Sequence, residues 1–547
     1  MKFLPLMLLL ATPWAVAQTY SDHAKLTQRL KAVESANPQS TKLTSLAKTA
    51  GGKDVWLLEI GTGDRASHPA IAVFGGVDGS HLLGTELAVG FAEKLLASAN
   101  TDSVKALLAG TAFYVFPNVS PDASEQYFAK VKYERTANAT PTDDDRDGKM
   151  NEDPFEDLNS DGQITWIRIE DPTGKWKAHP ADPRVMVMAN AEKGEKGTHN
   201  LIQEGTDNDK DGKFNEDGEG GVAFNKNLTF DAPYFTPGAG EHPVSEIEDR
   251  AILDYLYERF NVFAVVTFGP SNNLSEPWKF DKAKNAGRIP AGIMENDAKQ
   301  NKLASELYKK NVTLKDAPAA GPQKGDVSQW AYFHYGRHSF STPGWWAPKF
   351  EMPKDTAGAR ANGRLKANDD KNSDVDFIRW ADKEKVDVFM NWTKISHVDY
   401  PNMNAEIGGF KPFVKTNPPF SYVDKLATEH MKFIYQIAAR KPQIELLNLK
   451  VEALDGGVSR VTVTIQNSGL FPAVTDIGKN NNWIKLVKLT LNTSGDQTII
   501  GGKRVTLFPN LEAGESKTIS WLVKGKGKVT IEAGAPQTGF KTLNASL

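Results

Sequence analysis

The stretch that decides the fold is Gly75-Gly76-Val77-Asp78-Gly79-Ser80-His81-Leu82-Leu83-Gly84-Thr85-Glu86-Leu87. It follows an apolar run, Ala70 to Phe74, and opens an apolar-periodic segment that continues to about Ala97. A short apolar run, a glycine-rich turn and a helical period together predict a strand, a turn and a helix. Asp78 and His81, three residues apart on that turn, are both side chains that can bind a metal ion.

Four further segments resemble, in order along the chain, motifs of the zinc carboxypeptidase family (carboxypeptidase A-like). They are Phe116 to Ala123, Gly221 to Asn227, Pro243 to Glu248 and Val262 to Phe268. The resemblance covers roughly residues 40 to 440 and implies a mixed eight-stranded sheet with helices on both faces. The alternation of short apolar strands with helical patterns independently predicts an α/β domain.

The resemblance also identifies site positions, and several of them have changed. Asp78 and His81 stand where the family has its first two zinc ligands, a histidine and a glutamate. Gly269 stands at the third ligand position and Pro343 at the position of the catalytic glutamate. Glu406, which lies beside two glycines, is the best candidate for a substitute catalytic base, with an ordinary surface charge as the alternative.

The family's substrate-binding pair is partly kept. Asn225 is retained, and Lys226 replaces an arginine, which keeps the charge but not the two-pronged geometry that fits a carboxylate. His334 and His338 are alternative metal ligands or ordinary packed histidines. Three tryptophans are candidates either for a groove wall or for the core: Trp330, Trp345 and Trp346.

Three functions follow from this pattern. The first is a carboxypeptidase-like protein with a degenerate metal site that recognises peptide C-termini or cell-wall peptides and has little peptidase activity. The second is an active metallocarboxypeptidase with zinc held by Asp78, His81 and one ligand from elsewhere. The third is a calcium-stabilised structural or adhesive module. The missing third ligand favours the first.

An insertion at about residues 140–220 is rich in Asp, Asn and Gly. One pattern of alternating acidic or amide residues followed by glycine occurs three times in it. Alternating oxygen-bearing side chains on a tight turn suit calcium, which prefers six to eight oxygen ligands. The candidate calcium ligands are Asp143, Asp145, Asp147, Asp157, Asn159, Asp161, Asp207, Asp209 and Asp211. A solvated acidic loop is the alternative.

The two ends of the 547-residue chain differ from its middle. Lys2, the apolar run from Phe3 to Leu10 and the small residues Ala15 and Ala17 predict a signal peptide over residues 1–17, and hence export to a periplasm or the medium. Residues 18–440 are expected to form the α/β domain. Period-two alternation after residue 441 predicts a β-sandwich over residues 441–547.

The composition restricts the partners. Formal net charge is -3, and no long run of Lys or Arg is present, which argues against nucleic acid as a partner. Beyond the N-terminus no apolar stretch approaches the ~20 residues that span a bilayer. The chain has no cysteine, so no disulfide stabilises it. A peptide or cell-wall peptide is therefore the expected ligand, and the sequence leaves the oligomeric state open.

Overall fold

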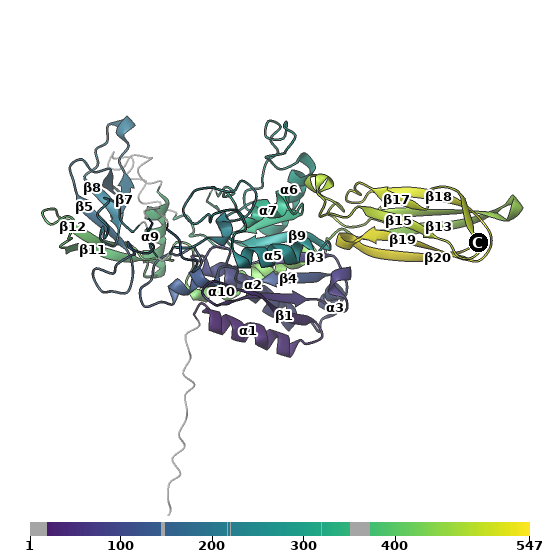
Figure 1. Cartoon of the computed structure of the whole chain (residues 1–547), viewed down its shortest axis with the longest axis horizontal. Coiled ribbons are helices and arrows are strands. Elements are labelled where there is room, and N and C mark those ends of the chain that lie inside the picture. The colour runs from purple at the N-terminus through teal and green to yellow at the C-terminus, as the bar shows by residue number, and fades with distance from the viewer. Residues whose placement is uncertain (1–18, 144–147, 216, 219, 319, 351–371) are drawn as a thin grey trace, which may run out of the picture.

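The computed structural model describes residues 19–143, 148–215, 217–218, 220–318, 320–350 and 372–547. The expected signal peptide and Asp145 and Asp147 lie outside these residues. Three bodies lie in a row, with an α/β body in the centre, a second sheet at one end and a β-sandwich at the other (Figure 1). Within the described residues, no helix is long and apolar enough to cross a membrane.

The central sheet has six strands in the order β1-β2-β4-β3-β9-β10. Their bounds are Thr41–Lys48, Asp54–Ile60, Ala112–Phe116, Ala70–Phe74, Val262–Phe268 and His338–Thr342. β4, β3, β9 and β10 run parallel, whereas β1 and β2 are antiparallel to their neighbours. All four parallel strands are buried along their whole length, as in a sheet covered on both faces, although β10 carries His338, two serines and Thr342.

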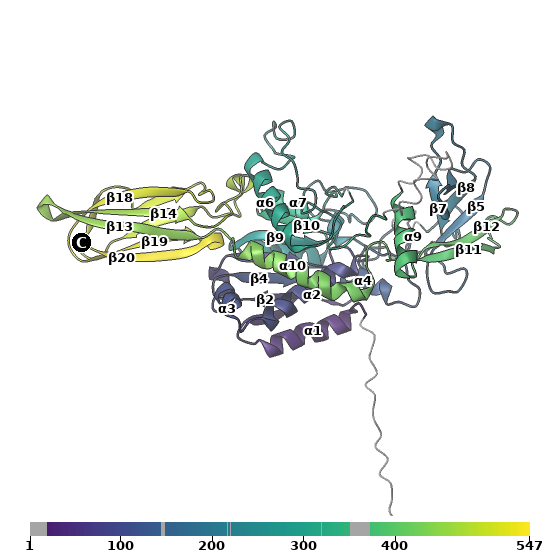
Figure 2. The ribbon, with the colours of Figure 1, turned by 180° about the vertical axis from the view of Figure 1, so that it is seen from behind.

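Helices cover both faces of this sheet, which confirms the predicted α/β class. On one face the core joins α1 (His23–Ala36), α2 (Leu82–Ala97), α6 (Glu295–Asn311) and α10 (Val423–Ala438). Figure 2 shows α10 and α2 lying across that face. On the other face the core joins α5 (Ile247–Tyr257) and α7 (Val327–Phe333). Short helices α3 (Asp102–Leu108) and α4 (Pro121–Ser124) flank β4.

The described central sheet has six strands rather than the eight expected, because later strands pair elsewhere. β11 (Phe389–Ile395) and β12 (Ala405–Phe410) join the insertion in a second six-stranded sheet, ordered β11-β12-β5-β8-β6-β7. The insertion strands are Trp166–Glu170, Trp176–His179, Asp182–Met188 and His199–Gln203, for β5 to β8. α9 (Ser373–Glu384) packs on β7 through a small core. The insertion is thus more than a set of loops.

The predicted C-terminal β-sandwich is confirmed as two four-stranded sheets, β13-β14-β18-β16 and β17-β15-β19-β20. In chain order its strands are Ile444–Leu454, Val458–Asn467, Val487–Asn492, Thr498–Gly501, Val505–Phe508, Ser516–Lys524, Lys528–Ala535 and Gly539–Ser546. Inward-facing residues of both sheets form one apolar core, because alternate positions along each strand face the same side.

Candidate functional site

The turn between β3 and α2 carries Asp78 and His81 at the carboxyl ends of the parallel strands. His81 is the residue that precedes the first turn of α2, and only 4% of it is exposed. Its Nε2 atom lies 2.8 Å from the backbone carbonyl oxygen of Pro343, to which it donates a hydrogen bond. The ring therefore joins the start of α2 to the residue that follows β10.

Burial lowers the pKa of His81, since a charged ring would lose its hydration there. The charge of Asp78 and the carbonyl oxygens of Pro343 and Phe268 act in the opposite direction but do not outweigh burial. The ring is consequently neutral, with its Nε2 proton committed to a backbone oxygen. The other ring nitrogen, Nδ1, is buried without a hydrogen-bond partner among the described residues and keeps its lone pair, as in a metal-ligating histidine whose second nitrogen donates to a carbonyl.

Asp78 is turned towards its own loop. Its Oδ1 atom accepts hydrogen bonds from the backbone N–H of Ser80, at 2.9 Å, and from the Ser80 hydroxyl, at 2.7 Å. Two donors on one carboxylate oxygen fix the turn that leads into α2. Asp78 and His81 are close in sequence, but each side chain is engaged with a different partner.

Gly269 has no room for the missing third ligand. A Cβ atom placed on it would lie 2.4 Å from Cγ2 of Val77, closer than real Cβ contacts. Val77 is 1% exposed, so its side chain fills the space that a residue-269 side chain would need. The loss of the histidine is therefore accompanied by packing that closes the position.

The corner formed by Asp78, His81 and Gly269 lacks the third ligand of a catalytic zinc site. Such a site needs three protein ligands and an open fourth position. Here His81 Nδ1 has no partner among the described residues and Asp78 Oδ1 is bonded to its own turn, but the third position has no side chain and is closed by a methyl group of Val77. Across the part of the chain that the structure describes, only Asp207, Asp209 and Asp211 bring three ligand atoms within 4.8 Å of one another.

Glu406 is not brought to this corner, which corrects the expectation that it lies at the site. It is on β12 of the second sheet, opposite Arg168 of β5. Its Oε2 atom accepts hydrogen bonds from Arg168 Nη2 at 2.6 Å and Nε at 2.8 Å. The reason is the pairing of β12 with the insertion, which moves the residue away from the central sheet (Figure 1).

Asn225 and Lys226 lie together on a short 3₁₀ turn, Phe224–Lys226. The Asn225 side chain is buried, and its Oδ1 atom accepts a hydrogen bond of 3.1 Å from the N–H of Val327, the first residue of α7. Lys226 is exposed, and its Nζ atom lies 3.3 Å from the carbonyl oxygen of Pro237. The asparagine's acceptor is thus committed to the fold, while the lysine remains accessible to a ligand.

His334 and His338 have structural surroundings. His334 Nδ1 is 2.6 Å from the Thr229 hydroxyl, and its ring meets Phe230 edge-on. His338 is buried on β10, and its ring stacks with Phe340. Neither side chain is placed with a second metal ligand. The three candidate groove tryptophans are all buried and belong to the core: Trp330, Trp345 and Trp346.

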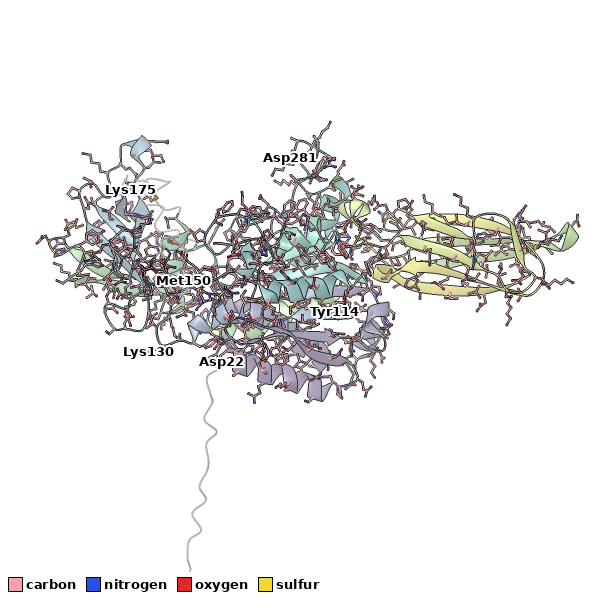
Figure 3. All side chains as sticks on the ribbon, in the orientation of Figure 1. Asp22, Tyr114, Lys130, Met150, Lys175 and Asp281 are labelled. Atoms are coloured by element: carbon pink, nitrogen blue, oxygen red, sulfur yellow. The ribbon has the colours of Figure 1, made fainter. Side chains whose placement is uncertain are left out.

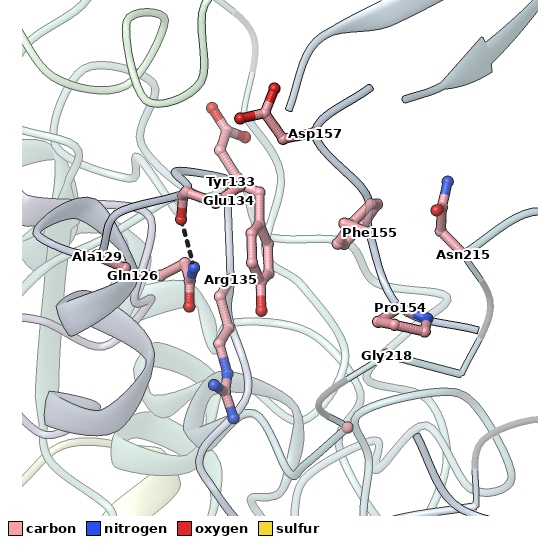
Figure 4. A pocket seen from close by; sticks show the side chains of 12 residues that line it. Gln126, Ala129, Tyr133, Glu134, Arg135, Pro154, Phe155, Asp157, Asn215 and Gly218 are labelled. Atoms are coloured by element: carbon pink, nitrogen blue, oxygen red, sulfur yellow. Dashed lines mark hydrogen bonds between the residues drawn. The ribbon is translucent and has the colours of Figure 1, made fainter. Parts of the chain in front are cut away.

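A cavity of about 390 Å³, which no sequence motif indicated, opens next to Glu134 and Arg135 (Figure 4). Tyr133, Glu134 and Phe155 contribute to its wall, with the two rings 4.8 Å apart. Glu134 Oε1 accepts a hydrogen bond of 2.8 Å from the N–H of Phe413. Burial raises the pKa of the Glu134 carboxyl, the N–H of Phe413 lowers it, and the charge of Asp78 raises it further. Glu134 is therefore a cavity-lining carboxylate close enough to Asp78 for its pKa to respond to that charge.

The three Asp-rich turns share one hydrogen bond. In each, the glycine N–H donates to the first aspartate: Gly148 to Asp143 at 3.0 Å, Gly162 to Asp157 at 2.8 Å, and Gly212 to Asp207 at 3.0 Å. In the second turn, Asp157 and Asn159 both accept from the N–H of Asp161. The sequence repeat is therefore also a structural repeat.

Comparisons with known proteins agree with this architecture. The family model for zinc carboxypeptidases matches residues 26–356, more than half of the chain, and the chain belongs to that family. A model described as a domain of unknown function matches residues 443–546. No curated protein matches the chain.

Solved structures of carboxypeptidases are similar at low identity. Carboxypeptidase A from Helicoverpa armigera is 12% identical, covers 77% of this chain and 73% of its own, and has a TM-score of 0.40. A metallo-carboxypeptidase from Burkholderia cenocepacia is 13% identical, with 58% of each chain covered and a TM-score of 0.32. One from Pseudomonas aeruginosa is 11% identical, with coverage of 76% and 68% and a TM-score of 0.32.

Proposed function

We propose that this member of the zinc carboxypeptidase family binds peptides, at their C-termini or in the bacterial cell wall, with little or no hydrolysis. The incomplete metal corner carries the proposal, because Gly269 offers no third ligand and Val77 fills the space where a side chain at that position would lie. Without a bound zinc and an aligned base, the reaction loses its Lewis acid and its proton carrier. General acid–base catalysis alone typically contributes about 10²–10⁴-fold.

Metal analysis and a hydrolysis assay test the proposal together. The purified protein should contain far less than one zinc per chain and show no chelator-sensitive release of C-terminal residues. The alternative is the active enzyme with rewired ligands. Chelator-sensitive turnover that disappears in Asp78→Ala and His81→Ala would establish that enzyme and overturn the proposal.

Lys226 is proposed to contact the peptide's carboxylate, with Asn225 beside it, because its ammonium group is exposed. Lys226→Ala should weaken peptide binding about two- to fivefold, the range of an exposed ion pair. Calorimetric titration of the protein with a short peptide measures this change in affinity. Lys299→Ala removes an equally accessible lysine on α6, 64% exposed, and should leave affinity unchanged. Equal affinities of Lys226→Ala and the unsubstituted protein would remove Lys226 from the site.

Calcium binding by the Asp-rich turns is a second proposal, and also the basis of a structural or adhesive role. Asp207, Asp209 and Asp211 already converge, and the Oδ1 atoms of Asp143 and Asp207 are buried without a hydrogen-bond partner among the described residues. A cation that binds only the folded state stabilises it. Calcium should raise the melting temperature, and Asp209→Ala or Asp145→Ala should reduce that rise. Identical melting curves in calcium and in chelator would refute the proposal.

Export is proposed from the N-terminal sequence pattern. Removal of residues 1–17 would give a chain that starts at Gln18, before the first described residue, Thr19. N-terminal sequencing of protein recovered from the periplasm or medium checks this. Retention of Met1 on the recovered protein would contradict it.

A further inference from the structure

A smaller cavity, of about 170 Å³, opens where the second sheet meets the segment after β12. It shares Glu134 and Phe155 with the cavity in Figure 4. The second sheet contributes Trp166 of β5 and Gln203 of β8, and Lys175, just before β6, marks this sheet in Figure 3. The volume is below the roughly 300–1,000 Å³ of drug-sized pockets, so the cavity suits one ring-sized group.

Aromatic side chains contribute much of the wall of this cavity. Trp166 is 37% exposed, and the rings of Tyr133 and Phe155 lie 4.8 Å apart and are tilted by 46°. Phe410 lines the cavity as well. A Cβ atom on Gly409 would lie 3.3 Å from Cδ1 of Trp166, so the glycine leaves room for the indole. Aromatic rings around a ring-sized space suit a ligand that has a flat apolar face.

The charges at this cavity disfavour a charged ligand. The Lys411 ammonium group is paired with the Asp387 carboxylate, and Lys415 Nζ lies 2.8 Å from Asp374 Oδ1. A phosphate or a carboxylate would therefore have to compete with both aspartates. The remaining charged residue of the lining is Glu134, and burial raises the pKa of its carboxyl, which weakens its attraction for a cation. The lining consequently favours an uncharged ligand.

Hydrogen-bonding groups of both kinds remain unused in the lining. Within the described residues, the indole N–H of Trp166, the side-chain amide of Gln203 and the Oε2 atom of Glu134 make no hydrogen bond. The indole only donates, an ionised carboxylate only accepts, and the amide does both. A ligand that carries several hydroxyl groups matches this mixed set, because each hydroxyl can donate and accept.

We propose that this cavity binds one pyranose ring of an uncharged saccharide. The C–H groups on one face of the sugar pack on the Trp166 indole, whose face is negative, while the hydroxyls at the rim of the sugar bond to Glu134 and Gln203. The inference does not depend on the proposed peptide site, since Lys226 does not line this cavity. It adds a saccharide site on the second sheet to a chain proposed to bind peptides.

Calorimetric titration of the full-length chain with cellotriose, maltotriose and tri-N-acetylchitotriose tests this. At least one of these uncharged trisaccharides should bind with a Kd below about 10 mM, and added salt should leave that affinity unchanged. Trp166→Ala should weaken binding at least about tenfold through lost apolar contact, and Glu134→Gln about fivefold through a weaker hydrogen bond. Trp483→Ala removes an indole of similar exposure, 40%, at the sandwich and should leave the affinity unchanged.

The outcomes decide the saccharide site separately from peptide binding, which is measured with peptides alone. Failure of all three trisaccharides to bind at about 10 mM overturns the inference. Saccharide binding that persists in Trp166→Ala and Glu134→Gln overturns the assignment to this cavity. Unchanged melting temperatures of the two variants exclude misfolding as the cause of a loss. Trp166→Phe keeps a ring and should recover part of the affinity lost in Trp166→Ala, and equal affinities of these two variants would overturn the stacking of the sugar.

Discussion

His81 holds the end of one strand and the start of one helix together through a single buried ring. The N–H at Nε2 donates a hydrogen bond to the backbone carbonyl oxygen of Pro343, which follows β10. The backbone of His81 directly precedes the first turn of α2. This hydrogen bond leaves Nδ1 without a partner among the described residues, so it secures the fold without an ion and is compatible with one.

Removing this ring should destabilise the metal-free protein. His81→Ala deletes a buried side chain and leaves the Pro343 carbonyl oxygen without its donor, at a cost of about 3 kcal/mol. Denaturant unfolding in the presence of a chelator measures the loss. His242→Ala, at an exposed histidine, should change the free energy of unfolding by less than about 0.5 kcal/mol. An unchanged value for His81→Ala would show that the ring does not secure the corner.

The positions of the altered site residues could be predicted from the sequence, but their partners could not. The family motifs place Asp78 and His81 on the turn after β3, and Gly269 directly after β9. The contact of Val77 with residue 269 joins positions almost two hundred apart in the chain, and no local pattern reports it. Glu134 was missed for the same reason, because its partner Phe413 comes from a distant segment.

At the scale of elements, the segments of the first and third Asp-rich turns are joined by reciprocal hydrogen bonds. Asp153, at the end of the first, accepts hydrogen bonds from the N–H groups of Asn208 at 3.2 Å and Asn215 at 2.6 Å. Asp217, at the end of the third, accepts one from the N–H of Asn151 at 2.9 Å. Both aspartates are 1% exposed. The exchange makes the two turns one unit.

Asp153→Ala should therefore open both turns without unfolding the central sheet. It leaves two backbone N–H groups without an acceptor, each costing about 1–3 kcal/mol if it stays buried. Hydrogen exchange at Asn208 and Asn215 should accelerate at least about tenfold, while the amides of β3 keep their protection. Asp496→Ala, at an exposed turn of the sandwich, serves as the control. Unchanged exchange in the Asp153→Ala protein would contradict the role of these reciprocal hydrogen bonds.

Local patterns predicted the strands and not all of their partners. The largely apolar runs that form β3, β4 and β9 indicate strands buried on both faces, and they form the centre of the sheet. β12 pairs with β5, more than two hundred residues earlier, to build the second sheet. Pairing at such a separation depends on tertiary packing, so the sequence indicated an insertion but not the sheet it forms.

At the scale of the whole molecule, the β-sandwich is fixed to the α/β body by hydrogen bonds. Arg337 is buried and its Nη2 atom donates to the Trp483 carbonyl oxygen at 2.7 Å. Asp297 on α6 accepts from the N–H of Asp476 at 2.8 Å. Burial raises the pKa of Asp297 to about 6. The two bodies should consequently unfold together, and their common stability should depend on the buried titratable groups near the junction.

His338 makes the stability of the folded chain depend on pH. Its ring contacts Phe471, in the segment that links β14 to β15, at 5.2 Å, and burial lowers its pKa to about 3. In the unfolded chain the ring takes a proton below about pH 6.5, but in the native state it stays neutral until about pH 3. Its contribution to stability is therefore present above about pH 6.5 and is lost as the pH falls. Asp297 acts oppositely, because its raised pKa makes stability fall as the pH rises from about 4 to 6.

His338→Phe should therefore flatten the acid side of the stability curve. Phenylalanine keeps the ring against Phe340 and Phe471 but binds no proton, so the protein loses less stability between about pH 6.5 and 4 than the unsubstituted chain does. Urea unfolding at a series of pH values measures the difference, which can reach about 1.4 kcal/mol per pH unit. Asp297→Asn should shift the slope the other way over the same interval. Parallel curves for His338→Phe and the unsubstituted protein would mean that the pKa of His338 is the same in the folded and unfolded chains.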